Sequence, residues 1–249
     1  MDGLYLIVYF TIVDILKTYI SPFFILMLII IYFQYRGIVD SPVKATITSM
    51  IYGSLGGIIA TILFIYLRIY IIPKDFIYIF FVAILLSLVN TRFMCFAYGG
   101  SIVALGNLLT GYPDIDPQDI MTIVAVFHLI ESVLIFLNGR SGSSIGYFNL
   151  NGKVVQGYNF NRFWALPFVI FIGDTMIRPM TLIAILNYGD FTLKSHPKIK
   201  TIKASMMLCI YSMVLFLILI QGLNSFIAPV FGILGHEFIV HYSIWREKS

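Results

Sequence analysis

The hydrophobic pattern of the chain is a series of long apolar runs separated by short polar links. A helix rises about 1.5 Å per residue, so about 20 apolar residues cross the roughly 30 Å hydrocarbon core of a membrane. The pattern predicts seven spans, or eight if the first run crosses fully instead of lying in the interface. The expected fold class is all-α, a polytopic transmembrane helix bundle over residues 1–249. The predicted spans are 4–19, 23–34, 45–72, 76–89, 93–109, 119–138, 204–223 and 226–242.

A polar lobe interrupts the apolar pattern at residues 139–162. Within it, Asn151-Gly152 is a strong signal for a type I′ turn, because both turn residues need positive φ. The lobe is therefore expected to form a small cytoplasmic β-hairpin. The predicted register places Phe148 opposite Val155 and Leu150 opposite Lys153.

The segment that follows, 163–190, is apolar but repeatedly broken. It predicts a re-entrant hairpin or, as the alternative, two short spans. The breaks are Pro167, Asp174, Arg178 and Pro179.

Composition supports a membrane protein and excludes an ordinary soluble domain. The chain is 59% hydrophobic and 11% charged, with a mean hydropathy of +0.94, whereas soluble domains are roughly a quarter charged. The net charge is +4, and most charged residues lie in the polar links between the apolar runs. We therefore interpret the charge as a signal of membrane topology and not of nucleic-acid binding. Twelve of the 16 Lys and Arg residues fall on one side if the spans alternate. This side, with the C-terminus, is expected to be cytoplasmic in a bacterial cell membrane.

The basic links are candidate contacts for anionic lipid headgroups or for cytoplasmic partners. The residues proposed for this role are Arg140, Lys153, Arg162, Lys194, Lys198, Lys200 and Lys203.

Two ionisable residues, His128 and Glu131, lie in the middle of the span 119–138. They are three residues apart and share a helix face, and charged groups at this depth are costly unless they face the bundle interior. They could form a proton relay or ligand site. The preferred interpretation is structural, with Glu131 hydrogen-bonded to His128 or paired with Arg178.

The last apolar run contains His236, Glu237 and His241, which resemble the HExxH motif of zinc proteases. The second histidine is one position too late, so on a regular helix the two imidazoles point about 140° apart. Cys95 and Cys209 lie in apolar stretches and are expected to act as small hydrophobes. No metal, cofactor or catalytic residue is therefore predicted.

Gly53 and Gly57 form a GxxxG pattern within 45–72. Small residues at this spacing let another helix approach closely. They predict a helix-packing site, through which the chain could also form a homo-oligomer.

Three short motifs resemble the membrane domains of MinJ-type proteins of Firmicutes. They are ESVLIFLNG at 131–139, NRFWALP at 161–167 and LGHEFI at 234–239. The resemblance implies a membrane adaptor for division-site placement, which links a DivIVA-like coiled-coil protein to the MinD-like part of the Min inhibitor system. It also implies a PDZ domain beyond Ser249, which this sequence does not contain.

The sequence thus predicts a scaffold that binds lipids and division proteins, without enzymatic activity. A proton-coupled or small-molecule transporter that uses His128 and Glu131 is the first alternative. An intramembrane metalloprotease is the second.

Overall fold

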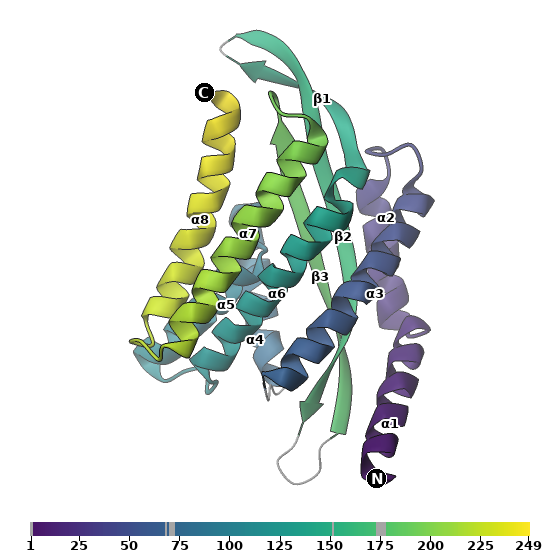
Figure 1. Cartoon of the computed structure of the whole chain (residues 1–249), viewed down its shortest axis with the longest axis vertical. Helices are drawn as coiled ribbons and strands as arrows, with labels where there is room; N and C mark the ends of the chain where they lie inside the picture. Colours follow the sequence, from purple (N-terminus) through teal and green to yellow (C-terminus); the bar gives the residue numbers. More distant parts are fainter. Residues whose placement is uncertain (1, 68, 70–72, 151, 173–177) are drawn as a thin grey trace.

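The computed structural model describes residues 2–67, 69, 73–150, 152–172 and 178–249 (Figure 1). This part of the chain forms eight α-helices, two short 3-10 helices and one antiparallel sheet with the strand order β1-β2-β3. The helices are α1 (Asp2–Tyr19), α2 (Pro22–Tyr35), α3 (Pro42–Tyr66), α4 (Pro73–Val89), η1 (Thr91–Phe93), α5 (Phe96–Thr110), α6 (Pro117–Asn138), η2 (Gly139–Gly142), α7 (Pro197–Ile220) and α8 (Ile227–Lys248). The strands are β1 (Ser143–Leu150), β2 (Lys153–Ile172) and β3 (Arg178–Thr192).

Among the described residues, α3, α6, α7 and α8 are long and apolar enough to span a membrane. The helices α1 and α2 give a fifth candidate, bent by 51°. This count corrects the prediction of seven or eight spans. The correction arises partly at α4 and α5, which have 17 and 15 residues and reach only about 25 and 22 Å.

The fold is mostly helical but not all-α. The segment 163–190 was predicted as a re-entrant hairpin or two short spans, but its described residues, 163–172 and 178–190, lie in the long strand pair β2–β3. Trp164, Ala165 and Leu166 are consecutive and fully buried, so β2 is covered on both faces here. Its sequence therefore lacks the alternation of apolar and polar residues that marks a half-exposed strand. A run buried on both sides cannot be told from a helix by its periodicity. Asp174, which contributed to the broken pattern, lies outside the described residues.

The predicted hairpin of the polar lobe is confirmed. β1 and β2 pair with Phe148 opposite Val155 and Leu150 opposite Lys153. Gly152 has a φ of +80°, as a turn of this kind requires. The hairpin continues the sheet beyond the ends of the neighbouring helices (Figure 1).

The helix α3 covers one edge of β2 at very short range. Cβ atoms added to Gly53 and Gly57 would overlap the backbone carbonyls of Ala165 and Pro167. The two glycines therefore pack against a strand, which corrects the predicted helix–helix contact. Because α3 comes so close, the Thr61 hydroxyl can accept a hydrogen bond from the Val169 amide at 2.9 Å.

The two ends of the bundle differ in charge. The start of α7, the end of α8 and the β1–β2 hairpin lie at one end, which we call the basic end (Figure 1). The start of α6 lies at the other, acidic end, with Asp114 and Asp116 exposed. The exposed cations of the basic end include Arg140, Lys153, Lys194, Lys198 and Arg246, and Lys203 is partly exposed.

Two predicted contact residues of the basic links, Arg162 and Lys200, are instead buried, with 0% and 5% exposure. The Arg162 guanidinium donates a hydrogen bond to Asn138 at the end of α6. Lys200 lies 3.3 Å from carboxylate oxygens of both Asp190 and Glu247. Both cations therefore join secondary-structure elements within the molecule and are not available to an external partner.

Candidate metal centre

Three helices bring a thiol and two imidazoles together near the middle of the bundle. Cys95 is the N-cap residue of α5, His128 belongs to α6 and His236 belongs to α8. His128 is eleven residues after Pro117 in the 22-residue α6, which places it about 16 Å along a helix about 33 Å long. Since α5 starts at this cluster, the turn between α4 and α5 ends halfway along the long helices.

The two sulfur–nitrogen distances in the cluster are close to those between two ligands of one metal ion. The Cys95 Sγ lies 3.2 Å from His128 Nε2 and 3.6 Å from His236 Nε2. All three ligand atoms lie within 4.8 Å of one another. Zinc bond lengths of about 2.3 Å to sulfur and 2.0–2.1 Å to nitrogen give a ligand separation of about 3.6 Å in a tetrahedron.

Neighbouring groups fix the protonation of both imidazoles. His128 Nδ1 lies 2.7 Å from the Val124 carbonyl, which can only accept, so Nδ1 carries the hydrogen. Tyr98 donates its hydroxyl hydrogen to Glu237 at 2.8 Å and accepts from His236 Nδ1 at 3.1 Å. Both Nε2 atoms therefore present lone pairs to the Cys95 sulfur, and such outer hydrogen bonds are typical of metal-binding histidines.

Glu237 supports the centre from outside it. Its carboxylate lies 3.0 Å from the Arg92 guanidinium and 3.3 Å from His241 Nε2. His241 is 67% exposed and does not approach the cluster. The HExxxH pattern thus separates on the helix as predicted, with His236 directed inward and His241 outward.

Glu131 lies close enough to the Cys95 thiol to interact with it electrostatically. The predicted hydrogen bond to His128 is absent, because the two ring nitrogens of His128 face Val124 and Cys95. Glu131 makes no hydrogen bond or ion pair with any side chain that the structure describes. The side chain of Arg178, its other predicted partner, lies outside that part.

The sequence prediction missed Cys95 as a ligand. Cys95 and His128 are 33 residues apart, and Cys95 and His236 are 141 apart, so no short motif contains them. Each residue alone looks like an isolated polar group in an apolar run. The only local signal was the position of His128 in the middle of a span.

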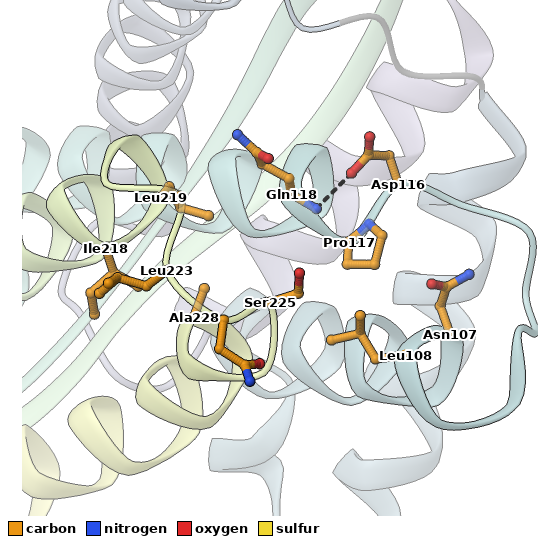
Figure 2. Close-up of a pocket in the computed structure, with 12 residues that line it drawn as sticks. Asn107, Leu108, Asp116, Pro117, Gln118, Ile218, Leu219, Leu223, Ser225 and Ala228 are labelled. Carbon is orange, nitrogen blue, oxygen red and sulfur yellow. Dashed lines mark hydrogen bonds between the residues drawn. The ribbon is translucent and has the colours of Figure 1, made fainter.

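A separate surface pocket lies at the acidic end, between the end of α5, the start of α6 and the α7–α8 turn (Figure 2). Its lining includes Asn107, Asp116, Gln118, Leu219 and Ser225. The predicted pair His128 and Glu131 does not line it.

Comparison of the chain with protein-family models, curated proteins and solved structures found no match.

Proposed function

We propose that this chain is a multi-pass membrane protein that binds a transition-metal ion of the Zn²⁺ class through Cys95, His128 and His236. The convergence of two Nε2 lone pairs on one thiol carries the proposal. A thiol has one hydrogen, so it can satisfy only one of these lone pairs. A metal ion bound by the thiolate would satisfy both. Sulfur with two imidazoles is a ligand set suited to zinc or copper.

The proposed activity at this centre is metal-assisted hydrolysis. Three protein ligands leave one tetrahedral position for water, as in catalytic zinc sites, whereas structural sites use four. A bound metal lowers the pKa of its water toward neutrality. Glu131 is the candidate general base because it lies three residues after His128 on the same face of α6 and interacts electrostatically with Cys95. This proposal replaces the His236–Glu237–His241 ligand set with one that lacks His241.

Elemental analysis of the purified protein tests the metal site. We expect about one metal ion per chain, and at least a tenfold loss in Cys95→Ser and in His128→Ala, because the ligand set would be incomplete. Cys209→Ser and His241→Ala are the matched controls and should retain the metal. Metal-free wild-type protein, after growth and purification with zinc, would contradict the proposal. Loss in His241→Ala with retention in Cys95→Ser would support the HExxxH set instead.

We propose a membrane adaptor for division-site placement as the second candidate function, with the DivIVA-like and MinD-like partners implied by resemblance. The β1–β2 hairpin favours it, since the hairpin carries exposed apolar side chains at the basic end. Ile145, Tyr147 and Val154 are 59%, 75% and 73% exposed and share one face.

Localisation tests the adaptor. A fluorescent fusion should concentrate at septa or poles, and Tyr147→Lys with Val154→Lys should spread it evenly because an apolar contact face would be lost. The control is Lys153→Glu at the same hairpin tip, which leaves that face intact. An even distribution of the wild-type fusion would refute the adaptor while leaving the metal site untouched.

A further inference from the structure

The turn between α4 and α5 lies halfway along the long helices and not at either end of the bundle. Its apex consists of Asn90, η1, Met94 and Cys95. Cys95 meets His128 and His236, each near the midpoint of a 22-residue helix. Both helices of the turn run from this apex toward the acidic end, where the end of α5 meets the start of α6 in the pocket of Figure 2. The half of the bundle between the apex and the basic end is therefore not covered by α4 or α5.

Polar and charged groups gather at the level of this apex. Asn90 is exposed, and the Arg92 and Glu237 side chains are 37% and 22% exposed. Glu131 is partly exposed and has no partner among the described side chains. In hydrocarbon such groups are strongly disfavoured, and intramembrane charges therefore face protein or a water-filled cavity.

These groups continue toward the basic end and not toward the acidic end. His241 lies four residues beyond Glu237, about 6 Å nearer the C-terminal end of α8, and is 67% exposed. Glu131 is likewise three residues beyond His128 in the direction of the basic end. Toward the acidic end, by contrast, α5 packs against α6 and α8 through buried residues that include Ala97, Val103 and Ala104.

We infer that a water-filled approach runs from the basic end to the apex of α4 and α5, bordered by Glu131, Glu237, Arg92 and His241. It would admit hydrated divalent cations, and among the described side chains Glu131 is the bordering carboxylate that has no hydrogen-bond or ion-pair partner. The role of the approach in loading the metal centre rests on the proposed function. The approach itself rests only on the exposure and charge of these residues.

Cysteine labelling with a membrane-impermeant maleimide tests the inference in intact cells and inside-out vesicles. All labelling variants are made in the full chain with the substitution Cys209→Ser. Cys95 is retained because it belongs to the proposed metal centre. The probe is Asn90→Cys at the apex. Ile210→Cys is the control at matched depth, because Ile210 is 59% exposed near the middle of α7. Lys198→Cys and Asp116→Cys report which side each end faces.

We expect Asn90→Cys to react at least tenfold faster than Ile210→Cys, and only from the side that labels Lys198→Cys. Equal, slow reaction of Asn90→Cys and Ile210→Cys would overturn the approach. So would reaction of Asn90→Cys from the side that labels Asp116→Cys. Metal analysis of the same preparations separates the two proposals. Protein that is labelled at Asn90→Cys but lacks metal would contradict only the metal centre. Protein that binds metal but is not labelled would contradict only the approach.

Discussion

Gly57→Ala is expected to destabilise the folded protein by about 3 kcal/mol or more. The added Cβ would overlap the Pro167 carbonyl, whose carbon would be only 2.8 Å away. Neither partner can move cheaply, because one is helix backbone and the other is strand backbone. Displacing α3 would also lengthen the hydrogen bond from the Val169 amide to Thr61. Thermal unfolding in detergent, followed by size-exclusion chromatography, measures the loss.

Gly189→Ala is the control for this substitution. Gly189 lies in β3, has no positive φ, and a Cβ there would meet nothing within 4 Å. It should unfold within about 0.5 kcal/mol of the wild type, as most harmless substitutions do. Equal stability of Gly57→Ala and Gly189→Ala would mean that α3 does not lie against β2 at the distance described.

Lys200→Met is expected to cost about 3–5 kcal/mol, because it leaves buried carboxylates without their cation. Asp190 and Glu247 both lie 3.3 Å from the Lys200 ammonium. Lys200 also donates a 2.7 Å hydrogen bond to Ser243. Glu247 in turn accepts from the Thr192 hydroxyl and from two backbone amides that follow β3. The network therefore holds the end of α8 against the β3–α7 connection.

The loss in Lys200→Met should depend on pH. Burial raises the pKa of Asp190, and the Lys200 ammonium opposes this rise. Without the ammonium the pKa of Asp190 should be higher still. Between the unfolded and folded pKa values, Asp190 is then protonated in the folded state and ionised in the unfolded state. Stability of the variant should fall as pH rises through that raised pKa, and it should partly recover near about pH 5. Unfolding curves at both pH values test this.

Lys198→Met provides the comparison on the same helix, because Lys198 is exposed. Its unfolding should match that of the wild type at both pH values. A Lys200→Met variant that is as stable as Lys198→Met would show that the buried charges are not paired as described.

The parts of the fold that the sequence predicted are those that depend on local signals. The Asn151-Gly152 dipeptide defined the register of β1 and β2, since a two-residue turn leaves no other pairing. The long apolar runs correctly indicated α3, α6, α7 and α8 as candidate spans. The separation of His236 from His241 also followed from helix geometry alone.

The errors arose where distant contacts decide the structure. Residues 163–172 and 178–190 form strands because β2 and β3 pair their backbone groups and α3 covers the free edge of β2. These contacts cannot be inferred from the segment itself. The Gly53 and Gly57 pattern correctly predicted that another element approaches α3 closely, but this element is β2 and not a helix. The thiol of Cys95 became a candidate ligand only when α5, α6 and α8 brought it to His128 and His236.

The cover that α3 gives to β2 also has a consequence for biogenesis. The amides of Phe163 and Val169 bond to Tyr35 and Thr61, groups more than 100 residues earlier in the chain. A strand pair released into lipid alone would expose such amides without water to replace those partners. We therefore expect α2 and α3 to be inserted before the strand pair β2–β3 enters the membrane.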